Sequence, residues 1–342
     1  MAVATTPTRK DFISDQDVRW CPGCGDYSIL ANVQRVMPEL GVPRENFVFV
    51  SGIGCSSRFP YYMNTYGFHT IHGRAPAFAM GIKASRPELS VWVVTGDGDG
   101  LSIGGNHLLH AIRRNLDIQL LLFNNRVYGL TKGQYSPTSL LGMRTKSSPD
   151  GSIDHPLDPL RFALGAGATF VARSIDVDAP HLQETLRRAH AHKGMAFVEI
   201  LQNCVVYNDD EWIEFEKRKQ RLNAALVLED GKPLVWGSES ERRGIRIQDG
   251  IPSIVSLEDG EDPISKGVAV HYERHETPAY AFALASLHRP EFPLPIGVFR
   301  AVDKPSYGLL LEQQVSEAID RRGEGDLTAL LHSGDTWTVE PD

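Results

Sequence analysis

The chain has 342 residues, of which 42% are hydrophobic and 23% charged, and its formal net charge at pH 7 is -8. This composition predicts a globular protein with a substantial core, arranged as one large domain or two smaller ones. The acidic balance argues against a nucleic-acid partner, because such binding draws on clustered positive charge. No apolar stretch is long enough to span a bilayer, and segment 1–17 is polar, unlike a secretory signal. We therefore expect a cytoplasmic protein without membrane contact.

Apolar, β-branched runs alternate with helical patterns after the polar leader 1–17. The expected helices are Tyr27–Leu40, Pro76–Arg86, Leu101–Asn115 and Ala179–His192. The expected strands are Phe47–Val50, Val91–Thr95, Ile118–Phe123, Thr169–Ala172 and Ala196–Leu201. Strands that are apolar throughout and alternate with helices favour an α/β, doubly wound, mostly parallel sheet.

The character of the chain changes after residue 207. Segment 209–221 is highly charged, and 227–264 is polar and rich in turn residues. We find no chemical motif there. We therefore expect a cofactor-binding domain at 18–207 and a C-terminal extension at 208–342, which packs on the core or on a partner subunit.

Four conspicuous segments each follow an expected strand. Gly52-Ile53-Gly54-Cys55 comes after the first strand, Gly96–Gly100 after the second, Asn124-Asn125 after the third, and Cys204 after the run that ends at Leu201. Ligands of doubly wound sheets bind beyond the carboxyl ends of the strands. The four segments should therefore meet at one edge of the sheet.

Asp97 and Asn125 have the chemistry of a metal-diphosphate site. Magnesium prefers hard oxygen ligands such as a carboxylate, an amide oxygen or a backbone carbonyl, with phosphate and water completing the octahedron. Glycines flanking Asp97 let the backbone approach a ligand, and a helix that starts near Leu101 would present its amino end to phosphate. Either half alone is explained as a tight turn or a loop. The two together, each after a strand and one βα unit apart, favour the metal site.

All four cysteines can be interpreted as one metal site. Cys21 and Cys24 form a C-P-G-C turn, whereas Cys55 and Cys204 stand at distant strand ends. Structural zinc and an iron-sulfur cluster both accept four thiolates. Structural zinc normally uses two close C-x2-C pairs, so the single pair favours a cluster. In a third interpretation, Cys55 and Cys204 are ordinary buried cysteines.

Several of these motifs together resemble one known family. The chain is similar to the β subunit of 2-oxoacid:ferredoxin oxidoreductases, and most similar to the 2-oxoglutarate type, over about residues 17–208. The matching segments are W-C-P-G-C-G at 20–25, G-I-G-C-S-S at 52–57, H-G-R-A at 72–75, G-D-G-D at 96–99, N-N-R-V-Y-G-L-T-K-G-Q at 124–134 and Y-S-P-T at 135–138. The pair G-D-G and N-N is the signature of thiamine diphosphate enzymes.

The resemblance implies a set of cofactors and their ligands. It implies that Asp97, Asn125 and the carbonyl of Val127 bind Mg²⁺, and that a 4Fe-4S cluster is held by Cys21, Cys24, Cys55 and Cys204. The residues that it places against thiamine diphosphate are Ile53, Gly54, Cys55, Ser56, His72, Gly73, Arg74, Gly98, Asp99, Gly129 and Leu130.

The implied reaction is the reversible decarboxylation of 2-oxoglutarate to succinyl-coenzyme A and carbon dioxide, with coenzyme A as co-substrate. Electrons pass one at a time through the cluster to ferredoxin, and the reverse direction would fix carbon dioxide, as in a reductive TCA cycle. Thiamine chemistry also needs a glutamate from a pyrimidine-binding domain, which this chain lacks. The resemblance therefore implies an α subunit that carries it, in an expected α2β2 assembly.

Three questions have more than one answer from the sequence alone. His72 and Arg74 either bind the diphosphate or cap a helix that begins near Pro76. Lys132 either pairs with the distal carboxylate of 2-oxoglutarate or is a solvated surface lysine. As a whole, the chain could act on pyruvate or another 2-oxoacid, could be a thiamine decarboxylase or synthase with no redox centre, or could be a non-catalytic subunit with a four-cysteine zinc site.

Overall fold

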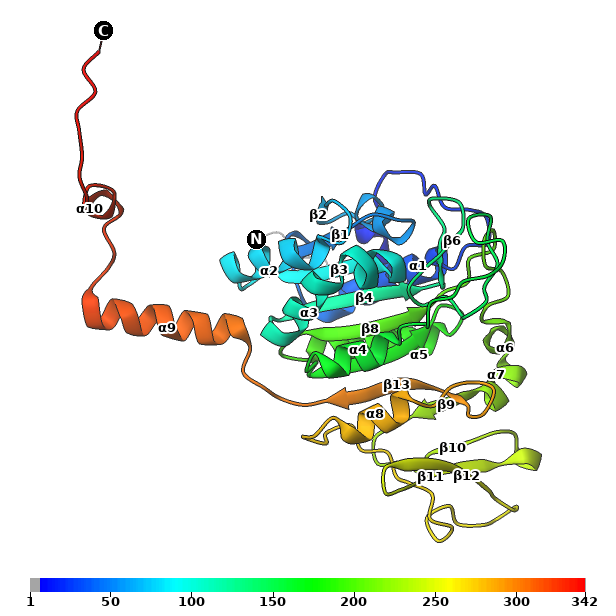
Figure 1. Ribbon diagram of the computed structural model, residues 1–342. Helices are drawn as coiled ribbons and strands as arrows, with labels where there is room; N and C mark the ends of the chain where they lie inside the picture. Colours follow the sequence, from blue (N-terminus) through cyan, green and yellow to red (C-terminus); the bar gives the residue numbers. More distant parts are fainter. Residues whose placement is uncertain (1–6, 342) are drawn as a thin grey trace.

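The computed structural model describes residues 7–341 and is built around one eight-stranded sheet (Figure 1). All neighbouring strands are parallel except β13 and β7, which are antiparallel. In spatial order the strands are β2 (Tyr66–His69), β1 (Phe47–Ser51), β3 (Ser90–Gly96), β4 (Ile118–Asn124), β8 (Ala196–Leu201), β7 (Phe170–Ile175), β13 (Leu294–Ala301) and β9 (Ala225–Leu228). This confirms the predicted α/β class.

Successive residues of the central strands enter two different cores, one on each face of the sheet. In β1, Phe47 and Phe49 join the core beneath α1 (Asp26–Val36) and α5 (Ala179–Ala191), whereas Val48 joins the opposite core. The helices of that opposite face are α2 (Ala75–Ser85), α3 (Gly105–Arg114), α4 (Pro159–Gly165) and α8 (Ala279–Ala285). Burial on both faces explains why these strands are apolar throughout and do not alternate with polar residues.

The five predicted strands and the predicted helices are present, but two helices differ at one end. The helix expected at Tyr27–Leu40 is α-helical only to Val36, and its last turn, Met37–Leu40, is a 3-10 turn that contains a proline. The helix expected at Leu101–Asn115 is wrong at its start. A wide π-type turn spans Asp99–Ile103, Ser102 lies outside helical geometry, and α3 begins only at Gly105.

The segment after residue 207 contributes to the central sheet. Helices α6 (Ile213–Glu216) and α7 (Arg218–Ala224) lead into β9, and β13 lies between β9 and β7. A small antiparallel sheet follows β9 in the chain and packs into the same core (Figure 1). Its strands are β10 (Val235–Trp236), β11 (Arg243–Gln248) and β12 (Ile251–Ser256). The expected division at residue 208 thus marks the end of the motifs and not the end of the sheet.

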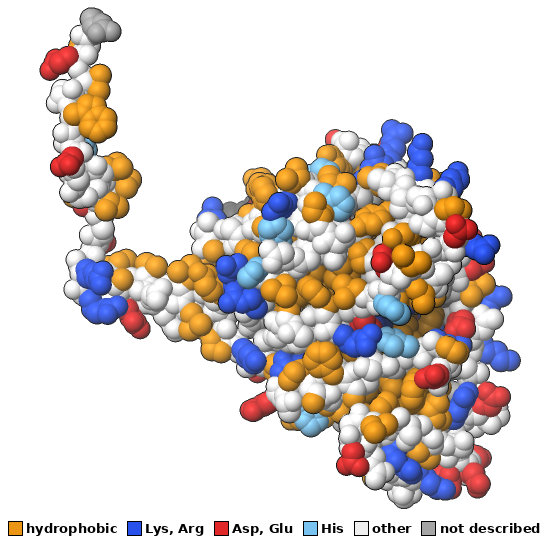
Figure 2. Space-filling view, viewed as in Figure 1, with side chains coloured by type: hydrophobic (Ala, Val, Ile, Leu, Met, Phe, Trp, Pro, Cys, Tyr) orange, Lys and Arg blue, Asp and Glu red, His pale blue; other side chains and the backbone are white. Residues whose placement is uncertain are grey.

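The two ends of the described chain differ in how they pack. Of the predicted leader 1–17, residues 1–6 lie outside the described part, while Phe12 is fully buried against Phe47. At the other end, α9 (Tyr307–Arg322) and α10 (Leu327–Leu331) project away from the body as an arm and bury none of their residues (Figures 1 and 2). Within residues 7–341, no helix is both long enough and apolar enough to cross a membrane.

Leu226 tests whether the segment after residue 207 belongs to the main core. It is fully buried in β9, whereas its neighbour Val227 is 47% exposed. Replacing Leu226 with Ala should lower the free energy of unfolding by about 2–5 kcal/mol, because a buried cavity is created. Val227→Ala should change it by less than about 0.5 kcal/mol. Denaturant unfolding measures both. An unchanged main transition in Leu226→Ala would show that this segment folds independently.

Candidate functional site

One cavity opens at the carboxyl ends of β1, β3 and β4, beneath the hairpin of β5 (Val127–Tyr128) and β6 (Gln134–Tyr135). Twelve residues that the sequence singled out line it. They are Ile53, Gly54, Cys55, Ser56, His72, Asp97, Gly98, Asp99, Asn125, Val127, Gly129 and Leu130. The parallel sheet thus brings three of the four conspicuous segments to one place, as expected from the fold.

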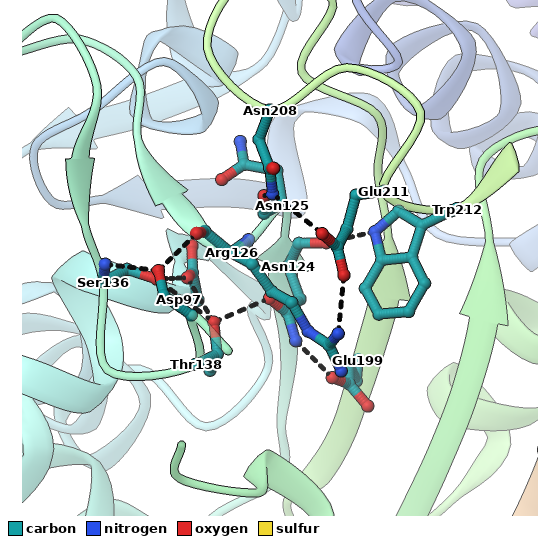
Figure 3. A network of polar contacts seen from close by, with 11 residues as sticks. Asp97, Asn124, Asn125, Arg126, Ser136, Thr138, Glu199, Asn208, Glu211 and Trp212 are labelled. Atoms are coloured by element: carbon teal, nitrogen blue, oxygen red, sulfur yellow. Dashed lines mark hydrogen bonds and ion pairs between the residues drawn. The ribbon is translucent and has the colours of Figure 1, made fainter. Parts of the chain in front are cut away.

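Asp97 is a buried carboxylate held by hydroxyl groups. Ser136 Oγ and Thr138 Oγ1 both donate to its Oδ2 atom, at 2.5 and 2.6 Å, and the side chain is 2% exposed (Figure 3). Burial raises the pKa of Asp97 to about 6, although the two hydroxyls act in the opposite direction. Among the described residues, no cationic side chain forms an ion pair with it. A buried carboxylate without a counter-charge suits a divalent cation.

A buried ion pair between Arg173 and Glu199 supports the Asn124-Asn125 turn from the interior of the sheet. Asn124 Nδ2 donates to Glu199 Oε1 at 2.7 Å, and Arg173 Nε donates to Glu199 Oε2 at 2.6 Å. Thr138 links this group to Asp97, because its hydroxyl also lies 3.0 Å from Asn124 Oδ1. Arg173 and Glu199 are both almost fully buried, so their bonds fix the turn with little freedom.

The segment after Cys204 closes over the same turn (Figure 3). Asn208 Nδ2 donates to the carbonyl of Asn125 at 2.9 Å, and the indole of Trp212 donates to the carbonyl of Asn124 at 3.3 Å. Glu211 forms an ion pair with Arg126 at 2.6 Å, and the guanidinium of Arg126 lies 4.5 Å from the centre of the Trp212 ring. None of these side chains was predicted from the sequence to belong to the site.

Asp99 joins three segments of the site through its side chain. Its Oδ1 atom accepts the backbone N–H groups of Ile53 (3.1 Å) and Gly73 (2.7 Å), and its Oδ2 atom accepts the hydroxyl of Thr95 (2.7 Å). His72 Nδ1 also lies 2.7 Å from Oδ1, without the alignment of a hydrogen bond. The carboxylate of Asp99 is thus occupied by the protein. The residue shapes the cavity and has little capacity left for a ligand.

Gly98 is required by the ring of Tyr128. A Cβ atom at position 98 would lie 2.2 Å from Cε1 of Tyr128, a distance that real side chains do not show. The phenol of Tyr128 also donates to the carbonyl of Gly98 at 3.0 Å. The glycine therefore lets the β5–β6 hairpin close onto the turn after β3, in addition to leaving its backbone accessible.

The cysteines gather beside this cavity. A Cβ atom at Gly129 would lie 3.6 Å from Cys55 Sγ and 3.7 Å from Cys204 Sγ. Cys24 N–H donates to the carbonyl of Cys21 and closes the C-P-G-C turn, and Trp20 Nε1 donates to the carbonyl of Cys55 at 2.7 Å. All four are free thiols. Within residues 7–341, no three His, Cys, Asp or Glu side chains stand close enough to share one metal ion.

Burial and neighbouring charges raise the pKa values of two of these thiols. Burial raises the pKa of Cys55 to about 12, and the carboxylate of Asp26 and the sulfur of Cys204 raise it further. Burial likewise raises the pKa of Cys24, with Asp26, Cys204 and Cys55 adding to the effect. Asp26 is itself buried at the start of α1, and burial raises its pKa to about 7.

Six of the residues predicted for the site do not line the cavity. Cys21, Cys24 and Cys204 lie on its cysteine side, as described above. The backbone of Gly73 bonds to Asp99, and the side chain of Arg74 contacts His107. Arg74 precedes α2 without capping it through its side chain, which goes against the helix-cap interpretation of Arg74. Lys132 is exposed at the tip of the hairpin, with a left-handed backbone (φ 78°).

Several residues of the site escaped sequence analysis. The cavity is also lined by Asp26, Phe123, Tyr128 and Thr131, and by Gly96, which was expected from the sequence as part of the turn. Ser136, Thr138 and Gln202 hold predicted ligands in place. A signal existed for Gln202, a polar residue directly after an apolar strand and two positions before a cysteine. Ser136 and Thr138 gave none beyond their place in the family match.

Comparison with known proteins identifies first the class and then the family. Residues 52–200 match the model of the thiamine pyrophosphate enzyme C-terminal TPP binding domain. The chain is 51% identical over 334 residues to 2-oxoglutarate oxidoreductase subunit KorB of Mycobacterium tuberculosis, covering 97% of this chain and 88% of the relative. It is 50% identical over 198 residues to the β subunit of 2-oxoacid:ferredoxin oxidoreductase 1 of Aeropyrum pernix, covering 58% and 62%.

A solved structure agrees over nearly the whole chain. The 2-oxoglutarate:ferredoxin oxidoreductase from Magnetococcus marinus, with 2-oxoglutarate, coenzyme A and succinyl-CoA bound, matches with a TM-score of 0.73 and 32% identity, covering 96% of this chain and 97% of the other. The fold is therefore that of a thiamine diphosphate enzyme. Within that class, the chain belongs to the family of 2-oxoacid:ferredoxin oxidoreductase β subunits.

The contact between Gly98 and Tyr128 predicts a coupled pair of substitutions. Gly98→Ala should destabilise the protein by about 1–3 kcal/mol, because the new methyl group overlaps the Tyr128 ring. In a Tyr128→Ala background the same change should cost clearly less, since the ring is gone. Gly105→Ala is the matched control, because nothing lies within 4 Å of its added Cβ atom. Equal costs of Gly98→Ala in both backgrounds, measured by denaturant unfolding, would rule out the contact.

Proposed function

We propose that this chain is the β subunit of an enzyme that oxidatively decarboxylates 2-oxoglutarate to succinyl-coenzyme A and carbon dioxide and reduces ferredoxin. The observation that carries the proposal is the cavity at the sheet edge, where Asp97, Asn125 and Cys55 face the same space. This common lining supports a thiamine site and a cysteine site that are adjacent. The relatives named for 2-oxoglutarate, and the solved relative with 2-oxoglutarate and coenzyme A bound, support the choice of substrate.

The proposed Mg²⁺ site consists of Asp97, Asn125 and the carbonyl of Val127. The donor set fits, because it offers a carboxylate, an amide oxygen and a backbone oxygen on one wall of the cavity. The hydroxyl groups of Ser136 and Thr138 both donate to Oδ2 of Asp97. Oδ1 of Asp97 is therefore the oxygen left for the metal. The pyrophosphate of the cofactor would complete the coordination.

The proposed 4Fe-4S cluster is held by Cys21, Cys24, Cys55 and Cys204. Each cysteine of such a cluster binds a different iron, so its sulfurs stand farther apart than the ligands of one ion. The gathering of free thiols without a site for a single ion suits this arrangement. Gly129 supports it further, because any side chain there would contact two of the sulfurs.

The chain's own contribution to the reaction is to bind, orient and exclude water. Thiamine diphosphate, when bound, supplies the carbon nucleophile and the electron sink that decarboxylation of a 2-oxoacid requires. Asp97 and Asn125 would anchor its diphosphate, while Asp99 and Tyr128 shape the cavity around it. Because Cys55 lines the same cavity, a cluster held by the cysteines would lie beside the bound cofactor and would supply an acceptor for its electrons.

The proposal includes a partner subunit. The described lining of the cavity contains Asp26, Asp97 and Asp99 but no glutamate to activate thiamine. We therefore propose that an α subunit supplies this glutamate and the rest of the substrate pocket, in an α2β2 assembly. The name of the relative from Aeropyrum pernix, which calls it subunit beta, supports a partner of this kind.

The direct test is the composition and activity of the complex. The chain, co-expressed with its α partner and purified without oxygen, should contain four irons, sulfide and thiamine per β subunit. It should reduce viologen with 2-oxoglutarate plus coenzyme A, and more slowly with pyruvate. Zinc in place of iron together with an absence of thiamine would overturn the proposal.

Removal of Mg²⁺ with a chelator should release the thiamine and abolish the activity.

Lys132 is the proposed contact to the distal carboxylate of 2-oxoglutarate. It is adjacent to Thr131, which lines the cavity. Lys132→Ala should lower kcat/KM for 2-oxoglutarate by roughly tenfold and leave pyruvate unaffected, because an ion pair worth about 1.4 kcal/mol is lost. Lys146→Ala, another exposed lysine on a following loop, is the control. An unchanged ratio of the two kcat/KM values would remove Lys132 from the substrate pocket.

A further inference from the structure

Gln202 is a buried amide between the two halves of the site. It follows β8 directly and is 1% exposed. Its Oε1 atom accepts a hydrogen bond from Asn125 Nδ2 at 2.8 Å. Its Nε2 atom donates to Cys24 Sγ at 3.3 Å and to the carbonyl of Asn203 at 2.5 Å. One side chain thus contacts a proposed ligand of each cofactor.

The orientation of this amide is fixed by its surroundings. A backbone carbonyl can only accept, so the carbonyl of Asn203 requires the NH₂ group of Gln202 on its side. The second N–H of that group then points to Cys24 Sγ, and the oxygen points to Asn125. A flipped amide would turn its one oxygen toward both the carbonyl of Asn203 and the sulfur of Cys24, and would turn its NH₂ group toward that of Asn125.

The orientation of the Asn125 amide follows from that of Gln202. Because Gln202 offers only an oxygen in that direction, Asn125 must turn its own NH₂ group toward Gln202. Its Oδ1 atom is then directed away, where it accepts the N–H of Val127 at 3.2 Å. This is the oxygen that a metal on Asp97 and Val127 would need. The carbonyl of Asn203 therefore fixes the orientation of the Gln202 amide, and that amide in turn fixes the orientation of Asn125.

The space for Gln202 is reserved by a glycine. A Cβ atom at Gly25 would lie 2.9 Å from Cγ of Gln202 and 1.8 Å from a carboxylate oxygen of Asp176. Gly25 immediately follows Cys24, so the cysteine turn and the buried amide fit together only with this residue. The packing leaves Gln202 little freedom to move away from the sulfur.

We propose that Gln202 is a positioning residue for both cofactors: its oxygen orients Asn125 toward Mg²⁺, and its N–H raises the reduction potential of the cluster through Cys24. This inference rests on the proposed function. An N–H donor to a ligand sulfur stabilises the extra negative charge of the reduced cluster, and hydrogen bonds to sulfur are among the factors that set the potentials of such clusters. The oxygen acts as an outer-shell partner of the metal.

Two substitutions separate the two roles. Gln202→Leu removes both contacts. It should shift the midpoint potential of the cluster to a more negative value and raise the dissociation constant of thiamine diphosphate, measured with Mg²⁺, roughly tenfold or more. Gln202→Glu keeps an oxygen for Asn125 but replaces the N–H that faces Cys24. It should shift the potential in the same direction and raise the dissociation constant less than Gln202→Leu does, because an oxygen for Asn125 is kept while the bond to the carbonyl of Asn203 is lost.

The measurements are a dithionite titration of the purified complex followed by EPR, in which the cluster gains one electron from the reductant, and fluorescence titration with the cofactor. Gln119→Leu is the matched control. That residue is also buried in the sheet, on β4. Its amide donates to Asp117 Oδ1 at 3.3 Å and hydrogen-bonds to no cysteine or proposed metal ligand within residues 7–341, so the substitution should change neither quantity.

The outcomes distinguish this inference from the proposed function. A wild-type complex without a cluster or without thiamine binding overturns the proposed function itself. A wild-type complex with both, together with a Gln202→Leu variant of unchanged potential and affinity, overturns the role of Gln202 alone. If Gln202→Glu fails to assemble, Gln202→Leu still decides, because it leaves no buried charge.

Discussion

The parallel pairing of β1, β3, β4 and β8 determines where every part of the site lies. Parallel strands end at the same edge, so the segments that follow them are neighbours however far apart they lie in the sequence. The register of β3 with β4 ends at Gly96 and Phe123, and that of β4 with β8 ends at Asn124 and Leu201. Asp97, Asn125 and Gln202 each follow one of these ends directly, which is why they meet.

The polar side chains beneath that edge serve orientation more than stability. The register sets Glu199 beside Arg173 on β7 and beside Leu122 on β4, deep in an otherwise apolar sheet. A buried ion pair of this kind contributes little net stability, because desolvation offsets its attraction. It does fix Asn124, and Thr138 connects Asn124 to Asp97. A continuous network thus extends from the interior of the sheet to the cavity.

Much of this architecture could be predicted from the sequence, because its signals are local. A run such as Ala196–Leu201 shows a fully buried strand on its own, and Gly96 to Gly100 shows a turn after a strand. The strand β2 was not predicted, because it has only four residues, all exposed, and its two aromatic residues are too short a pattern to indicate a strand. The strands β9 and β13 lie in a segment without motifs. In addition, β13 is antiparallel to its neighbour β7.

The contacts within the site were less predictable for a different reason. The need for glycine at 98 comes from Tyr128, thirty positions away, and the role of Gln202 comes from Asn125 and Cys24. Such relations depend on side chains that meet only after the sheet has formed. Residue types alone indicated which chemistry to expect, and the fold decided which atoms are free to perform it.

In the proposed arrangement, both cofactors bind at one sheet edge and are connected there through Asn125, Gln202 and Cys24. This arrangement is tested most directly by EPR of the reduced complex in which Mn²⁺ replaces Mg²⁺. The paramagnetic Mn²⁺ bound with thiamine diphosphate should broaden the cluster signal and speed its relaxation, whereas Mg²⁺ should not. A cluster signal that is the same with either ion would contradict the shared edge and place the two sites far apart.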